Sequence, residues 1–254
     1  MQRAALPSKP FVTPFVSITG AVVPSTLVSG DLFDVVTSRS GSVTAVLLDV
    51  AGHGAAAALI ASAARDNIRR TLHAGVPLGV VASNLESCLA SQGDVLNAVA
   101  ALGLVRFHPG ARVAEVLNAG LVPISLLRPD APPLCFPSRS PPPGLFSARE
   151  HPFDVVPLRG QGVFLLMSDG LTGGDSERAS VLDVCARTSI GRAGWAAGAS
   201  APEAIAALIR ENAPSIDGVL TDDATLVVAS FDARPNDREP VFGLADTIRP
   251  PGVG

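Results

Sequence analysis

The sequence predicts an α+β domain in which antiparallel strands form sheets and helices cover the outside. Apolar, β-branched runs follow one another, helical segments come in pairs, and the two kinds do not alternate as they would in a βαβ fold. Because each element must bury one apolar face, sheets with helices packed on their outer faces are the natural arrangement. The length of 254 residues fits one such domain.

The first half of the chain carries a strand followed by two helices. SVTAVLLDV (42–50) is a nearly continuous apolar run, which is typical of a strand buried on both faces. After a glycine-containing break, the alanine-rich segment 55–72 favours a helix, which Gly75 and Pro77 end. A second, amphipathic helix is expected over 78–90.

From about residue 95 the pattern becomes short β-like runs separated by turn signals, which predicts a meander of antiparallel strands. Residues 137–152 are proline-rich and predict a surface loop. The later strand-like segments are FDVVPL (153–158), GVFLLM (162–167) and ATLVVASF (224–231), and the later helix-like segments are 176–187 and 202–212. We expect the folded domain to span 15–231, between a loose entry (1–14) and a flexible tail (232–254).

Composition limits the classes of partner. Hydrophobic residues make up 47% of the chain and charged residues 17%, so the chain can build a large core. The net charge of -4 argues against nucleic acid as a partner, because phosphate backbones require basic surfaces. No segment has the length of a membrane span or the order of a signal peptide, and the three cysteines form no ligand cluster. These features predict a cytoplasmic protein.

Four aspartates share an unusual setting at the ends of apolar runs. Asp49 ends one such run and Asp169 ends another, whereas Asp222 begins the last one. Asp31 lies in SGDLFD, just before the strand that carries Asp49. Each of these aspartates stands beside glycine or a second carboxylate, in otherwise apolar sequence.

Carboxylates gathered at one site need compensation, because desolvation and mutual repulsion would otherwise favour their protonated forms. Divalent cations remove this conflict, and oxygen ligands suit Mg²⁺ or Mn²⁺. The alternative is that each strand-end aspartate caps a helix or forms a turn. Four aspartates in the same setting favour a common metal site over four independent caps, although spacing alone leaves both interpretations open.

Four motifs occur in order along the chain: SGDLFD (29–34), LLDVAGHGAAAAL (47–59), FLLMSDGLT (164–172) and DDATLVV (222–228). NAGLVPISLL (118–127) and PPPGLF (141–146) lie between the second and the third. In this order the chain resembles the SpoIIE/RsbU-type branch of the PPM metal-dependent serine/threonine phosphatases. The resemblance covers about residues 17–231.

The resemblance implies a four-layer α-β-β-α sandwich with two metal ions, Mn²⁺ or Mg²⁺, held at one end between two antiparallel sheets. Carried over to this sequence, Asp49 would bridge the two ions and the backbone carbonyl of Val50 would help to bind one of them. Asp169 and Asp222 would hold the other ion. Asp31 would act through metal-bound waters or as a direct ligand.

Other residues receive supporting or alternative roles. The resemblance implies that Asp34 and Asp223 support the ligands rather than bind metal. His53 follows the bridging aspartate and would serve either as general acid for the leaving oxygen or as a residue that stabilises the turn. Arg39 is a candidate for binding the substrate phosphate.

The sequence also departs from the pattern of this branch. Leu121 stands where the middle motif usually has histidine, which would alter substrate contacts rather than metal binding. Gln161 replaces a common aspartate, and the pair Gly173 and Gly174 follows DGLT in place of Glu-Ala. None of these changes removes an expected metal ligand, so we expect an active enzyme.

The resemblance implies a phosphatase that removes phosphate from serine or threonine of a regulatory protein. The substrate would be an antagonist of an anti-sigma factor, or a similar partner-switching regulator. Two alternatives stay open: a phosphatase fold that binds a regulator without turnover, and a metal phosphoesterase for a small molecule.

Overall fold

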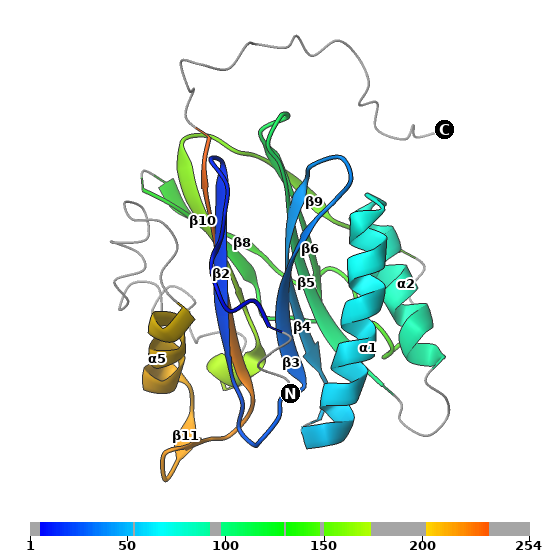
Figure 1. The fold of residues 1–254 in the computed structure, drawn as a ribbon, viewed down its shortest axis with the longest axis vertical. Coiled ribbons are helices and arrows are strands. Elements are labelled where there is room, and N and C mark those ends of the chain that lie inside the picture. Colours follow the sequence, from blue (N-terminus) through cyan, green and yellow to red (C-terminus); the bar gives the residue numbers. More distant parts are fainter. Residues whose placement is uncertain are drawn as a thin grey trace.

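Two antiparallel sheets pack face to face, and helices cover both outer faces (Figure 1). This computed structural model describes residues 6–52, 54–91, 98–129, 131–147, 150–173 and 202–233. The predicted α+β class and the four layers, α-β-β-α, are confirmed. None of the described helices combines the length and hydropathy that a membrane crossing would need.

The first sheet has six strands and brings both ends of the described chain together. Its strand order is β1-β2-β13-β10-β7-β8. The strands are β1 (Phe11–Val12), β2 (Val16–Val23), β13 (Ala224–Asp232), β10 (Gln161–Met167), β7 (Ile124–Arg128) and β8 (Ala131–Phe136). Helix α5 (Pro202–Asn212) packs on its outer face, mainly against β2 and β13 (Figure 1).

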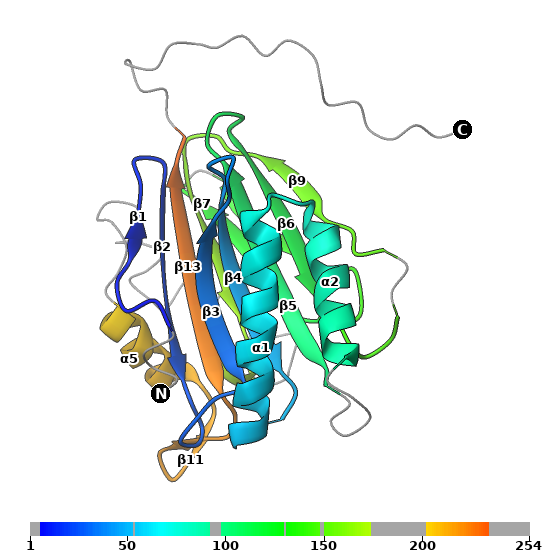
Figure 2. The ribbon, with the colours of Figure 1, turned by 45° about the vertical axis from the view of Figure 1, so that its right-hand side comes forward.

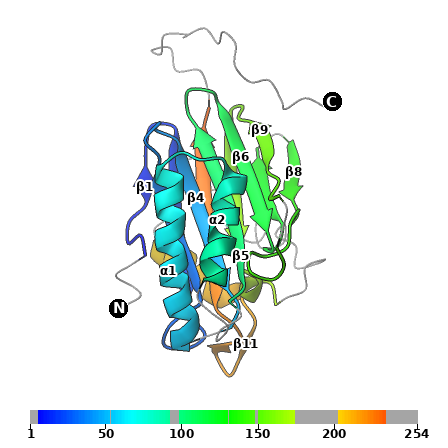
Figure 3. The same cartoon turned by 90° about the vertical axis from the view of Figure 1, so that its right-hand side faces the viewer.

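The second sheet has five strands in the order β3-β4-β5-β6-β9. The strands are β3 (Asp31–Thr37), β4 (Val43–Val50), β5 (Ala100–His108), β6 (Val113–Ala119) and β9 (Asp154–Pro157). Helices α1 (Gly54–His73) and α2 (Leu78–Ala90) lie side by side over its outer face (Figures 2 and 3). A small hairpin of β11 (Ser215–Ile216) and β12 (Val219–Leu220) follows α5.

The alternation of side chains along each strand produces three apolar layers. In β4, Ala45 and Leu47 point into the core between the sheets, whereas Val46 and Leu48 pack under α1 and α2. A third core lies between the six-stranded sheet and α5, where Ile205 is fully buried. Because β4 is buried on both faces, its sequence is almost continuously apolar.

The structure confirms several predicted elements and corrects two expectations. The expected helices at 55–72, 78–90 and 202–212 correspond to α1, α2 and α5. The expected meander is split, because β5 and β6 lie in one sheet whereas β7 and β8 lie in the other.

The second correction concerns the expected loose entry (1–14), which contains β1, where Phe11 and Val12 pair with β2. The expected helix at 176–187 lies outside the described residues, as does the tail from residue 234 onward.

Asp34 connects β3 to α1 rather than to the other aspartates. Its carboxylate is buried and accepts hydrogen bonds from Arg65 Nε at 2.8 Å and from Arg69 Nη1 at 2.6 and 2.8 Å. Asp31 and Asp34 are three residues apart in a strand, so their side chains lie on opposite faces of the sheet. Asp34 therefore anchors α1 and does not face the side of the sheet that carries Asp31.

We predict that Asp34→Ala lowers the free energy of unfolding by ~2 kcal/mol, because it leaves two arginines without their buried partner. Urea denaturation of the two proteins measures the difference. Arg70→Ala is the matched control, since Arg70 is exposed on the same helix and should change stability by less than about 0.5 kcal/mol. Equal effects of the two substitutions would contradict the anchoring role.

Candidate active site

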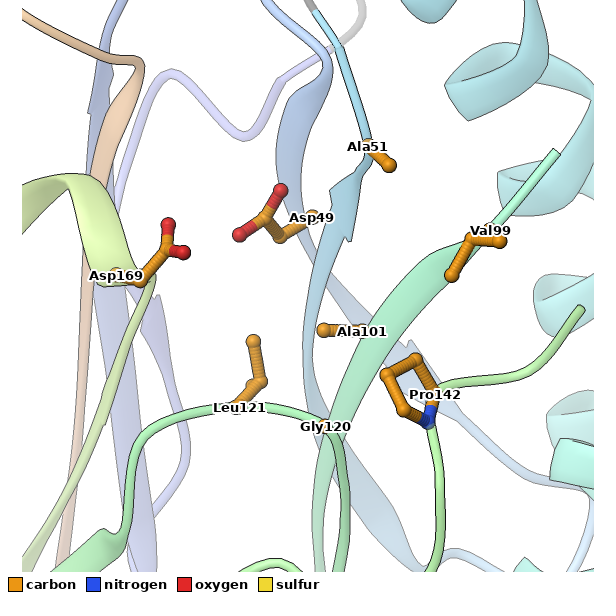
Figure 4. A pocket seen from close by; sticks show the side chains of 8 residues that line it. All are labelled: Asp49, Ala51, Val99, Ala101, Gly120, Leu121, Pro142 and Asp169. Atoms are coloured by element: carbon orange, nitrogen blue, oxygen red, sulfur yellow. The ribbon is translucent and has the colours of Figure 1, made fainter. Parts of the chain in front are cut away.

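A cavity of about 190 Å³ opens where β4 ends, where β5 begins and just after the end of β10. Asp49 and Asp169 face one another across it, Asp49 from the end of β4 and Asp169 from the short 3₁₀ helix η2 (Asp169–Leu171) (Figure 4). The lining residues are Asp49, Ala51, Val99, Ala101, Gly120, Leu121, Pro142 and Asp169. The cavity thus has two carboxylates opposite a largely apolar wall.

Strand register places Asp31 beside Asp49. The two residues are direct partners in the β3–β4 ladder, at the end of the hairpin away from its turn. Both belong to the set of odd-numbered residues that point between the sheets, as Phe33 and Leu47 do. The two carboxyl groups therefore stand together at the open end of the core between the sheets.

Asp31 is a buried carboxyl group with partners from the opposite sheet. Its Oδ2 accepts a hydrogen bond from Thr225 Oγ1 at 2.7 Å, and its side chain also hydrogen-bonds Ser168. Burial, followed by the charge of Asp49, raises the pKa of Asp31 well above its usual range. The folded protein therefore favours the protonated form of Asp31 more than water does.

Asp49 is partly buried, whereas Asp169 across the cavity is exposed. Burial raises its pKa from 3.8 to about 7, and the nearby carboxylate of Asp169 adds to this rise. A hydrogen bond from the side chain of Asp31 acts in the opposite direction. Asp222 also raises the pKa of Asp49, which places it within electrostatic reach.

Gly170 allows two distant segments to meet. Asp169 and Asp222 are both exposed, at the ends of the neighbouring strands β10 and β13. A Cβ at Gly170 would overlap the carbonyl oxygen of Asp223 and approach Cβ of Asp222 to 3.2 Å. Only glycine lets the SDG and DDAT segments approach this closely.

Asp223 stabilises a loop instead of facing the cavity. Its Oδ1 accepts hydrogen bonds from the backbone nitrogen and hydroxyl of Ser25, at 2.8 and 2.9 Å, and its Oδ2 accepts one from the backbone nitrogen of Gly30 at 2.8 Å. The loop between β2 and β3, which leads into Asp31, is fixed in this way.

Three further expected site residues have different outcomes. The carbonyl oxygen of Val50 lies against Gly30, where a Cβ would come within 2.7 Å, and Val50 is not among the residues that line the cavity. His53 lies outside the described residues. Arg39 lies in the turn at the other end of the β3–β4 hairpin, about 20 Å along the strands from Asp49. Arg39 therefore does not line this cavity.

The turn where the chain crosses between the sheets supplies cavity residues that the metal-binding pattern did not indicate. Between β6 and β7, Asn118 Oδ1 accepts a hydrogen bond from the backbone nitrogen of Leu121 at 3.0 Å. Leu121 and Gly120 line the cavity. Thr225 and Ser168, which contact Asp31, were also missed as site residues, although both stand inside the quoted DDAT and SDG motifs.

The carboxylate oxygens are suitable ligands for a hard divalent cation, but the described side chains do not stand close enough together to form a complete metal site. The carboxylates converge on a cavity lined by no basic residue in the described part of the chain, so their charge has no local counterion. Such oxygen ligands suit Mg²⁺ or Mn²⁺. Among the described residues, however, no three histidine, cysteine or carboxylate side chains stand close enough to hold a metal ion as they are.

Comparison with known proteins defines first the class and then the family. The fold is that of PP2C-type phosphatases, as in the PP2C phosphatase domain and a fragment of the regulatory domain of SpoIIE from Bacillus subtilis (TM-score 0.64, 21% identity, 88% of this chain and 64% of that one). Residues 39–232 match the family model of stage II sporulation protein E, SpoIIE. The chain therefore belongs to the SpoIIE family.

Two other solved structures share the fold. The RsbU and RsbW domains of Rv1364c from Mycobacterium tuberculosis give a TM-score of 0.67 at 21% identity, over 91% of this chain and 64% of that one. RsbX in complex with magnesium gives 0.61 at 16% identity, over 88% and 98%. This chain thus spans less than two thirds of the SpoIIE and Rv1364c chains. A search of the curated proteins found no significant match.

The raised pKa of Asp49 predicts a pH-dependent stability in the metal-free protein. A carboxyl group whose pKa rises on folding holds its proton more tightly in the folded state, so its ionisation destabilises the fold. The stability that the protonated Asp49 contributes is therefore lost as the pH rises from about 4 to about 7. Asn cannot ionise, so Asp49→Asn avoids this loss of stability. Above about pH 7 its free energy of unfolding should exceed that of wild type by on the order of 3 kcal/mol.

Denaturant unfolding in the presence of a chelator, at about pH 5 and about pH 8, measures this effect. The advantage of Asp49→Asn should be larger at the higher pH. Asp217→Asn serves as control, because Asp217 is exposed in the β11–β12 turn and should show no such difference. An advantage of the same size at both pH values would contradict the electrostatic origin.

Proposed function

We propose that this protein is a Mg²⁺- or Mn²⁺-dependent phosphatase that removes phosphate from serine or threonine of a regulatory protein. The observation that carries the proposal is the pair Asp49 and Asp169, which face one another across a cavity whose described lining residues include no basic side chain. Membership of the SpoIIE family and the PP2C-type fold support it.

In this proposal Asp49, Asp169 and Asp222 hold two ions, with the carbonyl of Val50 and the carboxyl of Asp31 as further oxygen ligands. A divalent cation bound there makes a coordinated water more acidic and neutralises charge on the phosphate. Because the pKa of Asp31 is raised and its side chain hydrogen-bonds Asp49, a cation bound beside them would favour the ionised form of Asp31.

The residues of the chain contribute orientation and exclusion of water. Thr225 and Ser168 hold the Asp31 carboxyl from the opposite sheet, so Asp31 keeps Asp49 in place. Leu121 and Ala101 cover the cavity behind Asp49 with apolar surface. This desolvation strengthens the attraction between the carboxylates and a cation.

The size of the cavity favours a phosphorylated side chain over a free small molecule. Pockets that enclose a small molecule usually measure about 300–1,000 Å³, whereas this cavity measures about 190 Å³. One phosphorylated side chain, presented by another protein, needs less enclosed space. The structures that share this fold include the RsbU and RsbW domains of Rv1364c and a protein of the bacterial stressosome, which supports a partner-switching regulator as substrate.

We predict Mn²⁺-dependent hydrolysis of a generic aryl phosphate and of phosphoserine peptides. Removing a carboxylate that would hold the metal should cost more activity than removing a residue that only supports a ligand, so Asp49→Asn should lower kcat/KM by more than ~100-fold. Steady-state kinetics over a range of Mn²⁺ and Mg²⁺ concentrations, with chelator as the zero point, measures both effects.

Arg39→Ala is the matched control, since Arg39 is exposed and stands at the far end of the hairpin. It should leave kcat/KM unchanged. No turnover at any metal concentration would exclude the enzyme and favour a regulator-binding module. Faster turnover of nucleotide or sugar phosphates than of phosphoproteins would favour the small-molecule phosphoesterase.

A further inference from the structure

The cavity divides into two halves of different chemistry. Asp49 and Asp169 form one half, and the other described residues that line the cavity carry no charged or hydrogen-bonding side chain. In Figure 4 the side chain of Leu121 points toward the space between Asp49 and Asp169, with Ala101 to its right and Pro142 farther away, beyond Ala101. If a metal ion at the carboxylate half holds a phosphorylated side chain, as proposed above, the adjacent residues of the substrate would therefore lie against Leu121.

We propose that the apolar half binds an aliphatic side chain next to the phosphorylated residue of the substrate, with Leu121 as the residue that determines this specificity. The inference rests on the proposed phosphatase function and deepens it by naming the substrate class.

The position of Leu121 is fixed from two sides. Its backbone nitrogen donates to Asn118 Oδ1, and Asn118 Nδ2 donates to the carbonyls of Val122 and Phe136, each at 3.1 Å. Its side chain lies over Gly103 of β5, where any Cβ would overlap the leucine Cδ1. Leu121 is consequently 5% exposed and held in one place.

Pro142 is fixed by a separate set of contacts. A Cβ at Gly120 would overlap the Pro142 ring, so the two turns fit closely together. The loop that carries Pro142 is joined to α2 through His151, whose Nδ1 lies 3.0 Å from Ser140 Oγ and whose Nε2 lies 3.2 Å from Glu86 Oε2. The apolar half is therefore formed before substrate arrives, which lowers the cost of binding.

The chemistry of this wall selects aliphatic groups. A polar side chain placed against Leu121, Ala101 and Pro142 would lose its water without gaining a hydrogen bond, which is unfavourable. An aliphatic side chain loses no hydrogen bonds to water there, and its burial removes apolar surface from water, which is favourable. Histidine at position 121, the residue usual in the related motif, would offer hydrogen bonds and weaken this selection.

Two short phosphoserine peptides that differ only at the flanking residues test the inference. One carries leucine on both sides of the phosphoserine and the other carries asparagine, which has a similar shape but is polar. With Mn²⁺ present, wild type should show kcat/KM about tenfold higher for the leucine peptide. Leu121→Asn and Leu121→His should each bring this ratio close to one. Because each ratio is taken within one variant, a general loss of activity cancels.

Leu134→Asn is the matched control, since Leu134 is 45% exposed on β8 and does not line the cavity. It should keep the wild-type ratio. Calorimetric Kd values for both peptides are measured alongside the kinetics. Tighter binding of the leucine peptide without turnover would support the inference while overturning the phosphatase function. Equal Kd and equal kcat/KM for the two peptides, with turnover present, would overturn the inference alone.

Discussion

The buried carboxyl group of Asp31 is the point at which the two sheets are joined by a polar interaction. Thr225 donates a 2.7 Å hydrogen bond to it from β13, and Asp49 stands beside it in the β3–β4 ladder. Because an unpaired buried carboxyl is costly, these partners must stay in place when the sheets pack. The ends of four strands, two from each sheet, are thereby brought to one edge of the molecule.

Close approach of the backbone completes this edge. Gly170 lets the segment after β10 lie against Asp223, while Asp223 ties down the loop that leads into Asp31. These contacts concentrate negative charge in a place where burial raises the pKa of Asp49 to about 7. Close carboxylates repel one another, and a divalent cation would remove this repulsion. The proposed metal binding and catalysis are therefore placed at this edge.

In the proposals made above, metal binding and substrate choice belong to different halves of the cavity. The carboxylate half comes from the ends of β4 and β10, whereas the apolar half comes largely from the crossing between β6 and β7 and from the proline-rich loop. Leu121 belongs to the apolar half, so a substitution at this position would alter the surface beside the proposed phosphate position without changing a carboxylate.

The sequence alone determined the local elements and the chemical character of the site. Apolar runs, alanine content and glycine or proline breaks depend on neighbouring residues, and they predicted α1, α2, β4 and β13 closely. Carboxylates at the ends of apolar runs, in ordered motifs, indicated the family.

Tertiary structure decided which strands pair, because strand partners are chosen by hydrogen bonds and packing between residues far apart in sequence. That choice split the expected meander between two sheets and separated Arg39 from Asp49 by the length of a hairpin. It also turned Asp34 toward Arg65 and set Leu121 over Gly103. The sequence therefore contained the charges, whereas only the packing of distant backbones defined which apolar surface they would face.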